Sequence, residues 1–273
     1  MDVQEHVIAP VLLNGVPKSG THLLHRVVGL LPGITSSGIA FHPDAFAKKV
    51  GFDENREQGI PIGVGRNLHF PKEAVLALVN KVRPGQSATG HVPYSDVFHS
   101  MLMERGWKTV TILRDPRDIV VSLATYKAEK PFHFFASQSS DDCILRSITG
   151  FAAKENGGSR LLSIDARYRR VLGWNQAAGN ITTRFEDLVG EQGGGSLAAQ
   201  AREIARIANH LKIELTNEAL EHVIAHSFGS TATFRKGTLG RWRDAFSTEH
   251  KRAFKNCAGE LLLELGYESG DQW

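Results

Sequence analysis

A glycine-rich loop near the start of the chain is the feature that most constrains its fold. Residues 9–14 are an apolar run, residues 21–31 place leucines and valines at helical spacing, and Pro-Lys-Ser-Gly-Thr at 17–21 joins the two. At such a strand–loop–helix junction, backbone N–H groups and the positive end of the helix dipole converge on one point. Lys18 places a mobile positive charge beside it. The stretch therefore predicts a phosphate or sulfate site in an α/β fold.

The rest of the chain continues this alternation. We expect further strands at 87–93, 108–113 and 180–185, and helices at 71–82, 95–105, 116–128, 144–151, 167–178, 197–211, 217–225 and 248–265. Residues 34–67 show no clear period and are interpreted as loops and short turns, and residues 227–240 as a long functional loop. Strands separated by helices predict a parallel sheet with helices on both faces and ligands at the carboxyl ends of the strands.

The length, charge and cysteine content of the chain limit the classes of protein to which it can belong. A chain of 273 residues that is 41% hydrophobic can bury a sizeable core, and we expect one domain over residues 1–273. A formal net charge of +3 without a long basic run argues against a nucleic-acid partner. The two cysteines, Cys143 and Cys257, are far apart, which favours a reducing compartment. No apolar run approaches the roughly 18 residues of a membrane span, so a soluble, cytoplasmic protein without a membrane partner is expected; its oligomeric state stays open.

Four chemically active side chains fall at the ends of expected strands. They are Lys18, His91, Arg114 and Phe185. Because the carboxyl ends of parallel strands meet at one edge of a sheet, we expect these side chains to share a site.

The first loop resembles a triphosphate loop only in part. Gly15 and Gly20 have the spacing of the pattern Gly-x-x-x-x-Gly-Lys-Ser/Thr, but Lys18 precedes the second glycine. Thr21 and His22 stand where the lysine and the hydroxyl residue belong. The mismatch weakens the interpretation as an ATP site, and a plain glycine turn that serves packing is an alternative.

Two further stretches carry basic residues suited to a compact polyanion. Arg114 follows the expected strand 108–113 and offers a fork of donors for a phosphate, and Ser122 on the next helix adds a hydroxyl. An ion pair of Arg114 with Asp118 or Asp115 is the alternative. The segment Phe-Arg-Lys-Gly-Thr-Leu-Gly-Arg-Trp at 234–242 could fold over a bound anion or be an exposed basic loop.

Together these stretches resemble the sulfotransferase family that uses 3′-phosphoadenosine 5′-phosphosulfate. Residues 17–21 are similar to its 5′-phosphosulfate loop, Arg114 with Ser122 to its 3′-phosphate site, and residues 235–242 to its Arg-Lys-Gly-x-x-Gly-x-Trp segment. Gly-His-Val-Pro at 90–93 resembles the family's Thr-His-Leu-Pro, and Phe-Glu-Asp at 185–187 its Tyr-Glu-Asp. The resemblance covers nearly the whole chain and implies a P-loop-like nucleotide-binding fold.

The resemblance also implies roles for individual residues. His91 would take the proton of an acceptor hydroxyl, Lys18 would stabilise charge on the leaving phosphate, and Ser122 would complete the catalytic set. The backbone N–H groups of residues 19–21 would hold the sulfate and the 5′-phosphate. The implied nucleotide-binding residues are Pro17, Lys18, Ser19, Gly20, Thr21, His22, Arg114, Ser122, Phe185, Phe234, Arg235, Lys236 and Gly237. The acceptor would be a small molecule with a hydroxyl group, and no metal is implied.

The chain departs from the family pattern at several positions. Leu23 stands where cytosolic members often carry a tryptophan, Phe185 replaces a tyrosine, Gly90 a threonine, and Arg241 an acidic or amide residue. The adenine contacts therefore differ most, while the phosphate contacts and the Lys18 and His91 pair are retained.

Other histidines and a cluster of aromatic residues are further candidates for a functional role. His22 with His25, and His222 with His226, have spacings that can bind zinc, but neither pair has an obvious third ligand. The aromatic cluster at 132–135 is interpreted as core rather than acceptor pocket.

The resulting hypothesis is a sulfotransferase that moves a sulfuryl group to a small-molecule hydroxyl. The alternatives are an ATP- and magnesium-dependent kinase, and a non-catalytic protein that binds adenosine bisphosphate.

Overall fold

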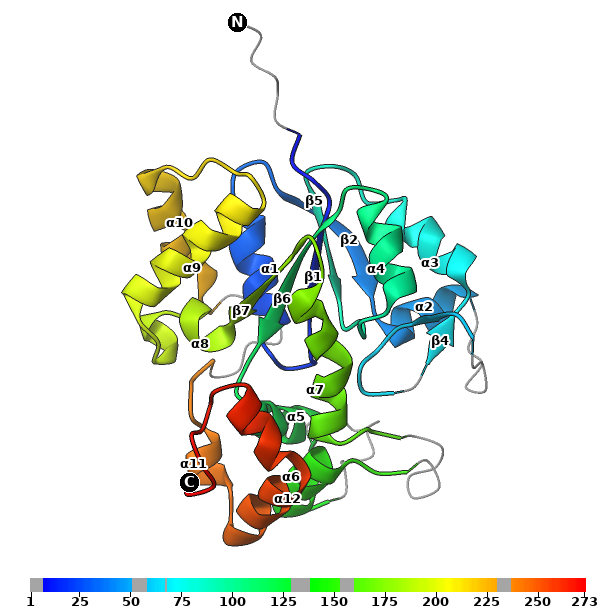
Figure 1. Ribbon diagram of the computed structural model, residues 1–273. Coiled ribbons are helices and arrows are strands. Elements are labelled where there is room, and N and C mark those ends of the chain that lie inside the picture. The colour runs from blue at the N-terminus through cyan, green and yellow to red at the C-terminus, as the bar shows by residue number, and fades with distance from the viewer. Residues whose placement is uncertain (1–6, 51–57, 67, 129–137, 153–159, 230–236) are drawn as a thin grey trace, which may run out of the picture.

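The centre of the fold is a five-stranded parallel sheet, seen in a computed structural model that describes residues 7–50, 58–66, 68–128, 138–152, 160–229 and 237–273 (Figure 1). The strand order is β2-β5-β1-β6-β7. The strands are β1 (Val11–Gly15), β2 (Thr35–Phe41), β5 (Gln86–Gly90), β6 (Lys108–Leu113) and β7 (Asn180–Arg184). A separate antiparallel pair joins β3 (Ile60–Pro61) to β4 (His69–Phe70). The expected α/β fold with a parallel sheet is confirmed.

The central strand β1 is apolar because both of its faces are covered. Val11 and Leu13 point into one buried cluster, and Leu12 points into the other, as the two-residue period of a strand requires. All three side chains are fully buried. A strand buried on both faces reads as a continuous apolar run, which is why its pattern was recognisable.

Helices cover both faces of the sheet. Against one face pack α1 (Thr21–Gly29), α8 (Phe185–Leu188), α9 (Leu197–His210) and α10 (Asn217–Ser227). The other side of the molecule carries α2 (Pro43–Val50), α3 (Lys72–Val79), α4 (Asp96–Met103) and α7 (Ile164–Leu172) with the 3-10 turn η2 (Gly173–Gln176). Figure 1 shows α9 and α10 on one side of the sheet and α3 and α4 on the other.

The remaining helices gather at the carboxyl end of the sheet. They are α5 (Pro116–Ala128), α6 (Ser140–Thr149), α11 (Trp242–Ala245) and α12 (Thr248–Glu264). A 3-10 turn, η3 (Glu191–Gly193), is not part of this group. Helix α6 packs against both α5 and α12 (Figure 1). This layer lies directly below the strand ends, so β6 feeds into α5 at the edge where ligands bind in open α/β sheets.

Serine and threonine caps fix where many of these helices begin. In α4, α6, α7, α9, α10 and α12 the residue before the helix accepts a hydrogen bond from a backbone N–H of the first turn. Each such cap satisfies one of the otherwise unpaired N–H groups at a helix start.

The expectation of loops and turns over residues 34–67 is wrong for much of that segment. It contains β2, α2 and β3. β2 is an edge strand with mostly exposed or half-buried side chains, and its pairing with β5 shifts register between Ser36 and Ala40. An edge strand that is broken by an irregularity has no regular alternation of apolar residues, so the sequence pattern could not reveal it.

Smaller differences concern element ends. The expected strand at 180–185 ends at Arg184, because Phe185 opens the short helix α8. The expected helix at 144–151 begins earlier, at Ser140. The aromatic cluster at 132–135 lies outside the described residues, as do residues 230–236 of the predicted loop 227–240. None of the helices in the described part of the chain is long and apolar enough to cross a membrane.

Candidate functional site

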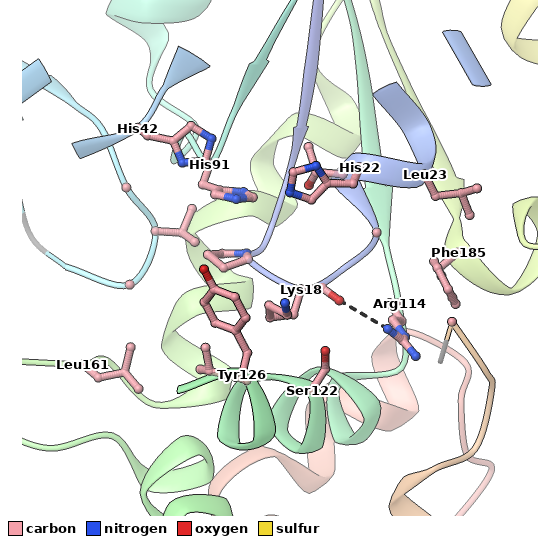
Figure 2. A pocket seen from close by; sticks show the side chains of 18 of the residues that line it. Lys18, His22, Leu23, His42, His91, Arg114, Ser122, Tyr126, Leu161 and Phe185 are labelled. Carbon is pink, nitrogen blue, oxygen red and sulfur yellow. Dashed lines mark hydrogen bonds between the residues drawn. The ribbon is translucent and has the colours of Figure 1, made fainter. Parts of the chain in front are cut away.

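A cavity of about 390 Å³ lies at the carboxyl ends of β1, β5 and β6. All four side chains expected at strand ends, Lys18, His91, Arg114 and Phe185, line it, and so does Ser122 from α5. Figure 2 shows these side chains around one space. The structure therefore brings together residues that are up to 167 positions apart in the chain, from Lys18 to Phe185.

The loop after β1 has the backbone of a tight anion cradle. Lys18 and Gly20 both adopt left-handed conformations, with φ of 75° and 107°. At Gly20 any Cβ would collide with the ring of Phe185, so the close approach of that ring requires glycine. A non-glycine residue with positive φ, as at Lys18, is uncommon and marks a constrained turn.

One expected contact of this loop is corrected by the geometry. The backbone N–H of Ser19, which we expected to hold the sulfate end, donates to the carbonyl of Val16 at 3.0 Å. That bond closes the turn itself. Ser19 is fully buried, and the lining of the cavity includes Pro17, Gly20 and Thr21 from the loop.

Three buried polar atoms around the loop have no hydrogen-bond partner among the described residues. They are Ser19 Oγ, Thr21 Oγ1 and Arg114 Nε. Unsatisfied buried polar groups are rare in proteins and point to a missing partner. All three can donate a hydrogen bond, which is the donor set that phosphate or sulfate oxygens need.

Arg114 connects three segments at the base of the cavity. Its guanidinium donates to the carbonyl of Lys18 at 3.4 Å and to that of Thr238 at 3.0 Å, and lies 3.6 Å from Asp118. The guanidinium also stacks on the ring of Phe185 at 4.1 Å from the ring centre. The ion pair proposed as an alternative is thus present, but it is buried and part of the cavity wall.

The residues next to Arg114 hold its strand end in place. Asp115 caps α5 by accepting the N–H of Arg117 at 2.9 Å, and its own N–H donates to Glu186 at 2.8 Å. The hydroxyl of Tyr168 donates to the carbonyl of Arg114. Burial raises the pKa of Glu186, and hydrogen bonds to it oppose that shift. This network was not predicted, since its members come from three separate segments, at 114–117, 168 and 186.

Helix α5 supplies the floor of the site. Ser122 lines the cavity, and one turn further on the ring of Tyr126 lies below the ammonium group of Lys18, 4.0 Å from Nζ to the ring centre (Figure 2). The cation–π contact holds the lysine charge over the cavity. Tyr126 was not among the expected site residues, although its position one helical turn after Ser122 puts both on one face.

His91 is oriented by a backbone hydrogen bond. Its Nδ1 lies 2.7 Å from the carbonyl oxygen of Gly15, which can only accept, so Nδ1 carries the proton and Nε2 keeps a free lone pair. Burial, followed by the neighbouring His42, lowers the pKa of His91 to about 3. The His42 ring stands edge-on to it, with centroids 4.5 Å apart. His91 is therefore neutral at physiological pH.

The other side of the cavity was missed by the sequence interpretation. It consists of His42 and Asp44 near the end of β2, the segment 63–66, and Arg160 with Leu161. The rule that ligands lie at the carboxyl ends of parallel strands would have pointed to His42, had β2 been recognised.

The remaining candidate residues fall into two groups. His22 and Gly237 line the cavity, and burial followed by the charge of Lys18 lowers the pKa of His22. Phe234, Arg235 and Lys236 lie outside the described residues. The histidine pairs do not gather further ligands, because no group of three His, Cys, Asp or Glu side chains suited to a metal occurs in the described part of the chain.

The structure is that of an α/β protein with a glycine-containing loop after its first strand and a histidine, His91, directly after a neighbouring strand. Residues 9–266 match the model of the sulfotransferase domain family, and the chain belongs to that family. The prediction of a sulfotransferase is confirmed at this level, and membership favours it over the kinase alternative.

Solved structures agree on the fold. Mouse sulfotransferase SULT7A1, complexed with PAP, is 15% identical with a TM-score of 0.63, over 95% of this chain and 86% of that one. Retinol dehydratase in complex with androsterone and the inactive cofactor PAP is 17% identical with a TM-score of 0.59, over 93% and 80% of the two chains. None of the curated protein sequences compared with the chain matches it significantly.

Proposed function

We propose that this protein transfers a sulfuryl group from 3′-phosphoadenosine 5′-phosphosulfate to the hydroxyl of a small molecule. The observation that carries the proposal is the placement of His91. Its protonated Nδ1 is held by the Gly15 carbonyl, so Nε2 is left to accept a proton in the same cavity as Lys18. A protein that only binds a nucleotide has no need of an oriented base beside a cation.

The loop and its surroundings fit the donor. The free hydroxyl of Thr21, the free Nε of Arg114 and the charge of Lys18 are a donor set for the anionic groups of the nucleotide. Arg114 and Ser122 would bind the 3′-phosphate, and Phe185 would lie against the adenine region. PAP in complex with SULT7A1 and with retinol dehydratase is in keeping with this assignment.

The proposed reaction follows from the positions of His91 and Lys18. The bound donor supplies a sulfuryl group whose S–O bond to the 5′-phosphate breaks as the acceptor oxygen forms a new S–O bond. His91 Nε2 takes the proton of the acceptor hydroxyl. Lys18 stabilises the charge that develops on the leaving phosphate oxygen. The products are a sulfate ester and adenosine 3′,5′-bisphosphate, and the proton passes from His91 to solvent.

A labelled-donor experiment tests the proposal. The purified protein is incubated with donor carrying 35S in its sulfuryl group and a panel of hydroxyl compounds, with and without a chelator. We expect label in an acceptor in both conditions. Labelling from γ-labelled ATP that a chelator abolishes would identify a kinase instead. Tight binding of the bisphosphate without transfer to any acceptor would identify a non-catalytic nucleotide-binding protein.

A further inference from the structure

The acceptor wall, defined as residues 63–66 and 160–162, is tied directly to the base. The N–H of Gly63 donates to the carbonyl of His91 at 2.9 Å, and the N–H of Leu162 donates to the carbonyl of Gly65 at 3.0 Å. Figure 2 shows Leu161 and Phe185 on opposite sides of Lys18. An acceptor whose hydroxyl meets His91 therefore extends along this wall, away from the nucleotide side.

Two arginines of the acceptor wall, Arg66 and Arg160, line the cavity. Neither forms an ion pair with a carboxylate in the part of the chain that the structure describes. Asp44 is the one acidic side chain among the described cavity-lining residues, so the charge on this side is positive. Cavity walls with an excess of one charge attract ligands of the opposite charge.

A third arginine strengthens the positive field behind the wall. Arg170 of α7 donates to the carbonyl of Arg66 at 2.5 Å. Burial, followed by the charge of Arg160, lowers the pKa of Arg170.

We propose that the acceptor carries an anionic group, a carboxylate or a phosphate ester, in addition to its hydroxyl, and that Arg66 and Arg160 bind this group. Guanidinium forks suit both kinds of oxyanion. This inference rests on the proposed function, because it assumes that the acceptor hydroxyl is the group that meets His91.

The test compares acceptors that differ only in charge. The panel pairs 4-hydroxyphenylacetate, 3-hydroxybenzoate and 12-hydroxydodecanoate each with its methyl ester, and glucose 6-phosphate with glucose. For at least one pair we expect kcat/KM to be at least about tenfold higher for the anionic member. Arg66→Ala and Arg160→Ala should lower that preference to about twofold or less, because kcat/KM falls much more for the anionic member of the pair than for the neutral one.

Matched variants separate charge from folding. Arg83→Ala removes an arginine at an exposed position outside the cavity lining and should leave the preference intact. Arg160→Lys should retain part of the preference, and Asp44→Asn should increase it. All variants should bind adenosine bisphosphate as the parent does in calorimetry, because these residues lie away from Arg114 and Phe185.

The outcomes distinguish this inference from the proposed function. Turnover of neutral acceptors only, a preference that survives both alanine substitutions, or no conversion of any anionic acceptor by protein that binds the bisphosphate would each overturn the anionic acceptor. Failure of the parent protein to bind the bisphosphate would overturn the sulfotransferase assignment itself.

Discussion

The guanidinium of Arg114 lies 3.6 Å from the carboxylate of Asp118, one helical turn along the chain, and both side chains are buried. Asp118 also accepts the N–H groups of Gly240 at 2.9 Å and Trp242 at 3.1 Å. The carboxylate thus joins the arginine at the cavity to the segment that follows residue 236. Burial raises the pKa of Asp118, and Arg114 opposes the shift.

Replacing Asp118 with alanine should weaken nucleotide binding. The substitution leaves Arg114 buried without its partner and releases two backbone N–H groups. We expect the dissociation constant for adenosine bisphosphate to rise at least about tenfold, measured by calorimetry, and the melting temperature to fall. Asp142→Ala, at a helix start away from the cavity, is the control. Unchanged bisphosphate affinity in the Asp118 variant would contradict the role.

His91→Ala should abolish turnover but keep bisphosphate binding, because the base contacts the acceptor rather than the nucleotide. We expect a loss of at least about a hundredfold in kcat, within the usual contribution of a general base. Single-turnover assays with labelled donor measure the rate, and calorimetry measures binding. A variant with the parent's turnover would remove His91 from the mechanism.

Lys18→Ala should also abolish turnover, since the charge on the leaving phosphate loses its stabilising cation.

Tyr126→Leu removes the ring below the ammonium group and should lower kcat less severely, by about tenfold. Tyr126→Phe retains the ring and should restore most of the rate, because a cation–π contact needs only the aromatic face. Equal rates for the leucine and phenylalanine variants would show that the contact has no part in catalysis.

Gly20→Ala should destroy the anion loop. Alanine is strained at a φ of 107°, and its Cβ would collide with Phe185, so the loop has to rearrange. We expect bisphosphate binding to become undetectable by calorimetry. Gly29→Ala is a matched control, because that position has ample space and no positive φ. Retained affinity in the Gly20 variant would place the nucleotide elsewhere.

The low pKa of His91 makes stability depend on pH with a definite sign. The folded protein has a pKa of about 3 at this residue, against 6.5 in the unfolded chain, so between these values the unfolded state binds the extra proton. The free energy of unfolding should therefore fall as the pH falls from 6.5 towards 3, by at most about 1.4 kcal/mol per pH unit from this group.

Urea unfolding of the parent and of His91→Asn at pH 7 and pH 5 measures this effect. The loss of stability at pH 5 should be smaller in the variant, because it lacks the contribution of His91. It should not vanish, because His22 and His42, whose pKa values are also lowered, contribute in both proteins. An identical loss in the two proteins would mean that His91 is not held neutral by its surroundings.

Regular helices and strands, and the residues at the strand ends, could be predicted from the sequence. Burial of one face or of both faces of an element leaves apolar residues in a recognisable pattern along the chain. β6 appears with the bounds expected, and α5 runs from Pro116 to Ala128 as predicted. Lys18, His91 and Arg114 were found because each follows such an element. The single-domain organisation and the roles of individual residues stay predictions.

Features that depend on distant contacts could not be predicted. The hydrogen bond of Ser19 to Val16 depends on the left-handed backbone conformation of Lys18. A lysine in the sequence does not indicate such a conformation. Arg66 and Arg160 line the same side of the cavity because the N–H of Leu162 donates to the carbonyl of Gly65, and both segments lack a periodic pattern. The acceptor side of the site is therefore the part that required a structure.

The strand order β2-β5-β1-β6-β7 divides the site into two halves that meet at β1. Arg114 and Phe185 follow β6 and β7, whereas His42 follows β2 and the acceptor wall attaches to the residue after β5. The contacts of Arg114 with Lys18, Thr238, Asp118 and Phe185 involve no residue of this wall, so substitutions in the wall should leave these contacts intact. The architecture offers a way to engineer new acceptor preferences on a constant nucleotide-binding half.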